Sequence, residues 1–209
     1  HAKGRLVEVF SDIRPNPTTD NVDACARIIR QNDLQFAVAL GGGSALDCAK
    51  AACSVCKTTA ATADFHSGKL KLGKESIPLV AIPTTSGTGS EVTPVAVLSD
   101  PTRGVKAPLV SDNFFPLCAV IDPELTLTLP PAITAATGMD VLAHALEGFW
   151  SKTHQPICDA VALQAARLCF DYLLPAYEDG ANIIAREKMS EASLLAGLAF
   201  GLPKTAGSN

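Results

Sequence analysis

The stretch FAVALGGGSALDCAK, residues 36–50, joins a short apolar run to a glycine-rich turn and then to an alanine-rich segment. The uninterrupted apolar run at residues 36–40 predicts a buried strand. The alanine-rich sequence that starts at Ser44 and continues to about residue 57 predicts a helix. The local unit is therefore a strand, a glycine turn and a helix.

The same alternation continues on both sides of this unit. Before it, PNP at residues 15–17 forbids helix, and Thr18 or Thr19 then caps a predicted helix with an apolar stripe. After it, residues 58–76 lack periodicity and are interpreted as a surface connection. Strands that alternate with helices predict a mostly parallel sheet with helices on its faces. The later strands are expected at residues 79–82, 92–98, 107–110 and 118–121.

From Leu129 onward the pattern changes to helices alone. Pro130 and Pro131 open a helix that continues to about residue 150, and two more are expected near residues 157–174 and 183–200. The simplest division is an α/β domain at residues 1–129, followed by an all-helical domain at residues 130–209.

Composition excludes several classes of protein. The 17 Lys and Arg against 21 Asp and Glu, with no basic run interleaved with aromatic residues, argue against a nucleic-acid partner. No apolar stretch approaches the ~20 residues that span a bilayer, and residues 1–10 lack the order of a signal peptide. We therefore expect a cytoplasmic protein with no membrane partner.

The seven cysteines are odd in number and lie mostly among apolar residues, which predicts free thiols. Cys53 and Cys56 have the spacing of a metal or redox pair, but the sequence has no second pair. The pair also falls within a helical pattern, so we favour buried packing over metal binding.

Two polar turns suggest a nucleotide site. The glycine turn at residues 41–44 exposes backbone N–H groups at the positive end of a helix, where a phosphate can bind. It matches neither the GxGxxG fingerprint nor the P-loop, and alone it is compatible with a purely structural turn. The second turn, PTTSGTGS at residues 83–90, supplies hydroxyls where open α/β sheets bind ligands. Two such turns in one domain favour a nucleotide.

A carboxylate and an imidazole share one face of the first C-terminal helix. Asp140 and His144 are four residues apart, the spacing at which both side chains can bind one metal ion, and Glu147 continues that face. The other interpretation is an ordinary ion pair on a helix surface. Two ligands do not make a complete metal site.

Four motifs, taken together, identify a family. They are PNPT at residues 15–18, GGGSALDCAK at 41–50, IPTTSGTGSEVT at 82–93 and GMDVLAHALE at 138–147. In order and spacing, over essentially the whole chain, they resemble the iron-containing (group III) alcohol dehydrogenases. The resemblance implies an N-terminal dinucleotide-binding domain, a helical domain and a catalytic divalent metal between them, usually iron and sometimes zinc. It implies an enzyme that transfers hydride between a small alcohol or aldehyde and NAD or NADP. Separately, we expect a homo-oligomer.

The family's motifs also assign residues by position. The metal would act as a Lewis acid on the substrate oxygen, with Asp140 and His144 as its first two ligands and no catalytic group beyond the metal ligands. For the cofactor site, Gly42, Gly43 and Ser44 would hold the pyrophosphate with Asp47 close by, and Thr84, Thr85, Thr93 and Lys106 would line the rest.

The chain also departs from the family pattern. The family's first strand and turn, with the acidic residue that holds the adenosine ribose, would precede residue 1. A third ligand, a histidine, is expected near residue 209, where the chain has Asn209. Either the histidine lies just beyond, or Asn209 replaces it. We therefore expect an incomplete portion of a longer protein, inactive alone.

Alternative functions follow from the same features. A glycerol or polyol phosphate dehydrogenase, or a dehydroquinate-synthase-like enzyme, would share the fold and the glycine turn. A nucleotide-binding module without catalysis would also account for the missing ligands. The sequence names neither the alcohol nor the choice between NAD and NADP.

Overall fold

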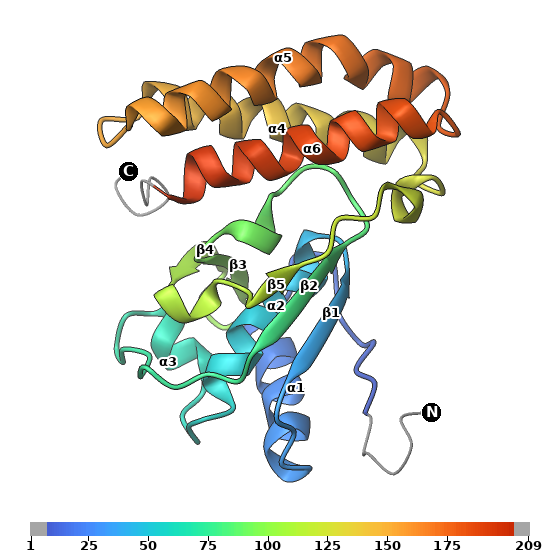
Figure 1. Cartoon of the computed structure of the whole chain (residues 1–209). Coiled ribbons are helices and arrows are strands. Elements are labelled where there is room, and N and C mark those ends of the chain that lie inside the picture. The colour runs from blue at the N-terminus through green and yellow to red at the C-terminus, as the bar shows by residue number, and fades with distance from the viewer. Residues whose placement is uncertain (1–7, 203–209) are drawn as a thin grey trace.

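The structure, a computed structural model, describes residues 8–202 of the chain. An α/β region forms its lower half, and three helices lie above the carboxyl ends of its first strands (Figure 1). The three-stranded sheet has the order β1-β2-β5, and both pairings are parallel. Its strands are β1 (Ala37–Gly41), β2 (Leu79–Pro83) and β5 (Cys118–Ala119). The predicted α/β architecture with a parallel sheet is confirmed.

Two helices pack behind one face of this sheet (Figure 1). They are α1 (Thr19–Gln31) and α2 (Gly43–Val55). α1 begins where the sequence predicts, because the Thr18 side chain accepts a hydrogen bond from the Asn21 amide in a capping box. Val22 on α1 and Leu46 on α2 are fully buried in the shared core. α2 therefore has a fixed position, with its first turn at the carboxyl end of β1.

Residues 37–41 form β1 where a strand was predicted, but the prediction that this strand is buried was wrong. Ala39 is buried, but Val38 is 55% and Leu40 is 60% exposed. Within the described residues β1 is an edge strand of its sheet, and α2 covers one of its faces. The apolar run therefore correctly predicted a strand, but it did not predict that one face of the strand is exposed.

Strands β3 (Val95–Asp100) and β4 (Val105–Val110) form a separate antiparallel pair. Alternation of strands and helices did not predict this pairing. The turn between them includes Gly104, which has a φ of 63°. Short 3₁₀ turns complete the region: η1 (Ser90–Val92), η2 (Asp112–Phe114) and η3 (Pro123–Thr126).

The segment interpreted as a surface connection contains a short helix, α3 (Thr62–His66), which corrects that prediction. Thr62 and Phe65 on this helix are buried. The Thr62 amide and hydroxyl both donate to the Asp23 carboxylate on α1, at 2.9 and 2.5 Å. A distant partner therefore fixes this segment, and local periodicity could not show it.

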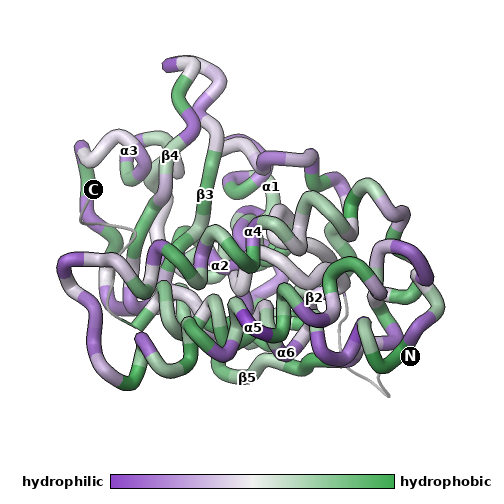
Figure 2. Tube along the Cα trace, turned by 90° about the horizontal axis from the view of Figure 1, so that it is seen from above, coloured by the Kyte–Doolittle hydropathy of each residue, from purple (hydrophilic) through white to green (hydrophobic). Residues whose placement is uncertain are grey.

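The C-terminal region consists of α4 (Pro131–Trp150), α5 (Pro156–Glu178) and α6 (Ile183–Gly201). Figure 2 shows these helices lying side by side, with hydrophobic and hydrophilic segments alternating along them. Glycines on α4 allow the close approach, since a Cβ at Gly138 would lie 2.2 Å from Leu173 Cδ1 on α5. The change from strands to helices falls between η3 and α4. The domain division at residue 129 stays a prediction.

Arg186 on α6 holds the connection between the two regions in place. Its guanidinium is buried and donates to the Thr134 hydroxyl at 2.8 Å and to the carbonyls of Gly180 and Leu129 at 3.0 and 3.3 Å. Burial lowers the pKa of this arginine.

Among residues 8–202, no helix combines the length and apolar character that a membrane span requires.

Candidate active site

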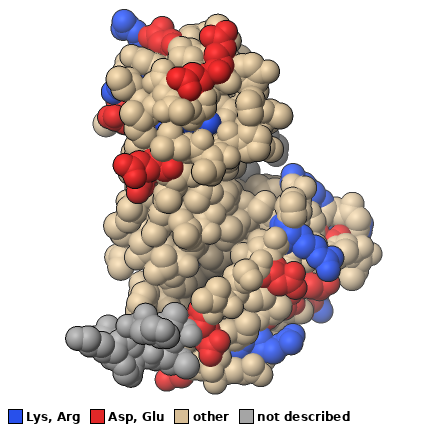
Figure 3. Space-filling view, turned by 90° about the vertical axis from the view of Figure 1, so that its right-hand side faces the viewer, with Lys and Arg blue, Asp and Glu red and all other residues tan. Residues whose placement is uncertain are grey.

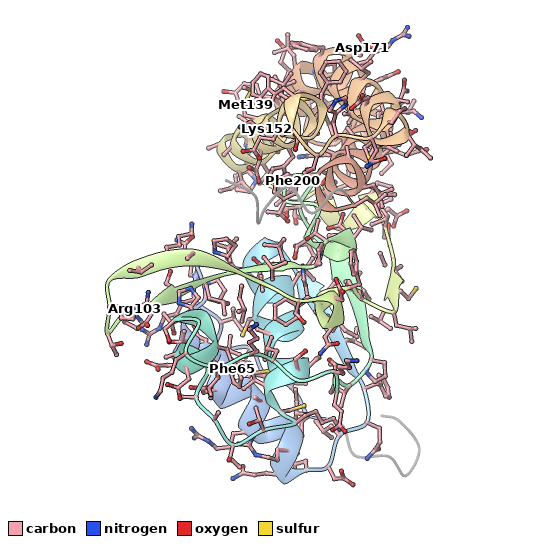
Figure 4. The ribbon with its side chains drawn as sticks, turned by 90° about the vertical axis from the view of Figure 1, so that its left-hand side faces the viewer. Phe65, Arg103, Met139, Lys152, Asp171 and Phe200 are labelled. Atoms are coloured by element: carbon pink, nitrogen blue, oxygen red, sulfur yellow. The ribbon has the colours of Figure 1, made fainter. Side chains whose placement is uncertain are left out.

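A cavity of about 1980 Å³ lies between the α/β region and the helices. Figure 3 shows the molecule hollowed between its two lobes, and Figure 4 shows Phe200 on the side of α6 that faces the α/β region. The cavity brings together residues that are far apart in the sequence. Of the predicted site residues, those that line it are Gly42, Gly43, Ser44, Asp47, Thr85, Thr93, Lys106, Asp140 and His144.

The glycine turn caps α2 without a side chain. Gly42 is the N-cap and forms no side-chain cap hydrogen bond. The Gly43 and Ser44 amides of the first turn are therefore open to an anion, whereas the Ala45 amide donates to the Gly42 carbonyl at 2.9 Å. A Cβ at Gly43 would lie 2.6 Å from Thr88 Cγ2, whereas a Cβ at Gly42 would only reach ordinary contact with Thr85 at 3.4 Å. Gly43 therefore serves the packing of the two turns, and Gly42 leaves the approach to the amides clear.

The second polar turn connects the cavity to α6. The Ser86 and Ser190 hydroxyls lie 3.0 Å apart, and the Gly87 amide donates to Ser193 Oγ at 2.8 Å. Thr85 and Thr93 line the cavity. Thr84 is not among the lining residues, and its amide instead donates to the Gly41 carbonyl at 3.0 Å. The structure thus brings Thr84 to the end of β2 but not into the cavity wall.

Lys106 is held at the mouth of this site. Its Nζ donates to the side-chain oxygen Oδ1 of Asn16 at 2.7 Å, and the backbone N–H of Asn16 donates to Ser44 Oγ at 3.2 Å. Asn16 has a φ of 56°, a left-handed conformation that asparagine tolerates better than most residues. Among the lining residues of the described chain, Lys106 is the one lysine or arginine. It is therefore the cation available to a phosphate or ribose oxygen in this cavity.

Both carboxylate oxygens of Asp47 have partners within the protein. Oδ1 accepts from Ser90 Oγ at 2.6 Å, and Oδ2 accepts from the Val97 amide at 2.8 Å. Burial raises the pKa of this carboxyl, and the nearby Lys50 ammonium opposes that shift. Asp47 therefore supports the second turn, and its predicted proximity to a pyrophosphate stays a prediction.

Asp140 and His144 face the cavity from α4. Asp140 Oδ1 lies 3.7 Å from His144 Nε2, and the imidazole stacks on Phe200 with ring centroids 4.9 Å apart. His144 Nδ1 is buried and has no hydrogen-bond partner among the described residues. One oxygen and one nitrogen donor at this separation fit two positions around a divalent metal ion.

The described residues alone do not complete a metal site. Within residues 8–202, no three His, Cys, Asp or Glu side chains gather closely enough to hold a metal ion, although Glu147 also lines the cavity. Asn209, near which the third ligand is expected, lies outside the described residues. Asp140 and His144 therefore remain a predicted pair of metal ligands.

All seven cysteines are free. Cys53 and Cys56 are buried, and Cys56 Sγ donates to the Cys53 carbonyl at 3.1 Å. Burial raises the pKa of both thiols, which disfavours the thiolate that a metal requires. These observations support packing over metal binding for this pair.

Three residues around the cavity received no role from the sequence: Lys50, Asn16 and Phe200. Lys50 lies three residues after Asp47, and this spacing was the one local signal for it. Its burial depends on partners 40 and 43 residues away in the chain, at positions that no local pattern indicates.

Comparisons with known proteins place the chain in a family. The family described as iron-containing alcohol dehydrogenase matches residues 1–123, and the C-terminal family of Fe-containing alcohol dehydrogenases matches residues 134–208. The chain is 44% identical over 194 residues to 1-propanol dehydrogenase PduQ of Salmonella typhimurium, covering 93% of this chain and 49% of that protein. It is 40% identical over 197 residues to NAD-dependent methanol dehydrogenase of Bacillus methanolicus, covering 94% and 51%.

A solved structure gives the same result. Sulfoacetaldehyde reductase from Bifidobacterium kashiwanohense in complex with NAD⁺ is 57% identical, with a TM-score of 0.91, over 94% of this chain and 52% of that chain. The chain spans about half the length of these relatives. The resemblance stated from the four sequence motifs is confirmed.

Proposed function

This chain belongs to the iron-containing alcohol dehydrogenase family, and we propose that it forms part of an NAD(P)-dependent enzyme that transfers hydride between a small alcohol or aldehyde and the cofactor. The observation that carries this proposal is that one cavity is lined by the glycine turn, by Lys106 and by the Asp140–His144 pair.

The α/β wall would bind the dinucleotide. The open amides at the N-terminus of α2 suit a pyrophosphate, because they combine free donors with the positive end of a helix. Lys106, held by Asn16, is placed to reach a ribose or phosphate oxygen. The NAD⁺ complex of the 57% identical relative supports a dinucleotide in this cavity.

The helical wall would hold the metal. Asp140 and His144 would supply two ligands, and the metal would provide Lewis-acid chemistry at the substrate oxygen. Phe200 stacks on the imidazole, which restricts its rotation and shields that side of the ring from water. With Nε2 as the metal ligand, Nδ1 would carry the ring proton, and it has no hydrogen-bond partner among the described residues.

Sulfoacetaldehyde is a specific candidate substrate. Two relatives are sulfoacetaldehyde reductases, one 57% identical and the other, from Bilophila wadsworthia, 39% identical. The 1-propanol dehydrogenase is 44% identical, so a short unsubstituted aldehyde is the competing substrate. We also propose that the whole protein is a cytoplasmic homo-oligomer.

The test uses the full-length gene product. NADH and NADPH oxidation would be followed with sulfoacetaldehyde and with propanal, and bound metal would be measured by elemental analysis. We expect near-stoichiometric iron or zinc and reduction of at least one aldehyde. Cofactor binding without metal or turnover would favour a non-catalytic nucleotide-binding module. Activity confined to a polyol phosphate would favour the related dehydrogenase branch.

A further inference from the structure

A buried lysine lies on α2 directly beneath the cavity. Lys50 is 1% exposed, and its Nζ donates to the Ser90 carbonyl at 2.7 Å, to Ser90 Oγ at 2.9 Å and to Thr93 Oγ1 at 3.2 Å. Asp47 Oδ1 lies 3.8 Å from the same nitrogen. The three N–H groups of the ammonium are therefore all engaged by Ser90 and Thr93.

This arrangement fixes the direction of two hydroxyl groups. An ammonium donates and never accepts, so Ser90 Oγ and Thr93 Oγ1 must each accept from Lys50. Ser90 then donates its own proton to Asp47 Oδ1 at 2.6 Å. Thr93 has no acceptor for its hydroxyl proton among the described residues, although it is only 3% exposed and lines the cavity. Its proton remains available to a ligand in the cavity.

We propose that Lys50 is a positioning residue that orients the Thr93 hydroxyl so that its proton is donated to an oxygen atom of the bound dinucleotide. This inference rests on the proposed function, because it needs a dinucleotide in the cavity. Lys50 itself does not touch the ligand. It acts through Thr93, whose lone pair it occupies.

The surroundings of Lys50 show why a cation stands here. Burial lowers the pKa of Lys50, and the nearby carboxylates of Asp47 and Glu91 offset part of this shift, which leaves the pKa at about 8. Without the Lys50 ammonium, nothing among the described residues would fix the direction of the Thr93 hydroxyl proton.

A double-mutant cycle on NADH affinity tests the proposal in the full-length protein. Lys50→Met keeps the length of the side chain and removes its donors, and Thr93→Val removes the hydroxyl. We expect each single variant to weaken NADH binding by about 3- to 10-fold, the usual effect of one hydrogen bond. The double variant should bind no more weakly than either single variant. Independent, multiplicative losses would overturn the proposal.

Further variants separate this role from folding. Thr93→Ser retains a hydroxyl, so it should bind NADH normally when Lys50 is present and weakly when residue 50 is Met. If Lys50→Met does not fold, as shown by its melting temperature, Thr93→Val decides alone, and unchanged NADH affinity overturns the proposal. A wild-type protein that fails to bind NADH would instead contradict the proposed function.

Discussion

The two walls of the cavity differ in how completely their polar groups are paired. On the α/β wall, Asp47 accepts two hydrogen bonds, and Lys106 is held by Asn16. On the helical wall, Asp140 lies 3.7 Å from His144, and His144 Nδ1 is buried without a partner among the described residues. A paired wall is preorganised for a ligand, whereas an unpaired one needs further groups to complete it. Substitutions on the two walls should therefore separate cofactor binding from turnover.

The largest expected effect is on the helical wall. In the full-length protein, His144→Ala should lower kcat by roughly 10³-fold or more, because it removes a metal ligand, and should change NADH affinity by less than about 2-fold. Steady-state or stopped-flow kinetics measure kcat, NADH titration measures the affinity for the cofactor, and elemental analysis measures the bound metal. His154→Ala is the matched control, since His154 is an exposed histidine paired with Asp159 at 2.9 Å. An active His144→Ala enzyme with full metal content would show that Asp140 and His144 form only an ion pair.

Lys106→Ala should have the opposite signature. Loss of a charged hydrogen bond costs on the order of 1.5–3 kcal/mol, so NADH affinity should fall roughly 10- to 100-fold. The melting temperature should change little, because Lys106 is exposed. Lys69→Ala, which removes an exposed lysine paired with Asp64 at 2.8 Å, serves as the control. A collapsed melting temperature with normal NADH binding would assign Lys106 to folding.

Neighbouring glycines sharpen the comparison within the α/β wall. Gly43→Ala should destabilise the protein by about 1–3 kcal/mol, because its Cβ would lie 2.6 Å from Thr88 Cγ2. Gly42→Ser should change the free energy of unfolding by less than about 0.5 kcal/mol from the wild-type value, since Gly42 has ordinary extended backbone and serine is a favourable N-cap. It should still weaken NADH binding by placing a side chain near the open amides. Urea unfolding and NADH titration of both variants decide whether the turn serves packing, binding or both.

Local features of the fold could be predicted from the sequence. The helix expected from residue 131 to about 150 is α4 (Pro131–Trp150), because proline at the first turn and a long periodic pattern are local signals. The strand before the glycine turn was also predicted, but its exposed face was not. The short helix α3 was not predicted either, since five residues are too few for periodicity and the buried Thr62 depends on Asp23 in another helix.

The candidate site divides in the same way. The glycine turn and the Asp140–His144 spacing are visible within a few residues, and the structure places both in one cavity. Lys50 received no role, because a lysine in an alanine-rich helix ordinarily faces solvent. Its burial depends on Ser90 and Thr93, which the fold brings to it from a separate turn. Sequence spacing identifies groups that bind a ligand directly, and the groups that orient them need the tertiary structure.

The smallest expected effect concerns Cys53, the α/β-wall alternative to the metal site on α4. Burial raises the pKa of this thiol above its usual value of 9.0, so it stays protonated in the folded protein at pH values where the unfolded chain ionises. The contribution of Cys53 to the free energy of unfolding is therefore fully present below about pH 9, and it decreases as the pH rises further. Cys53→Ala should cost about 1 kcal/mol at pH 7.5, and this difference from wild type should shrink by roughly 1 kcal/mol by pH 10. Urea unfolding at the two pH values measures the change. Because a protonated, buried thiol is a poor ligand, the variant should keep its full metal content, and loss of metal from Cys53→Ala would move the metal site from the helical wall to α2.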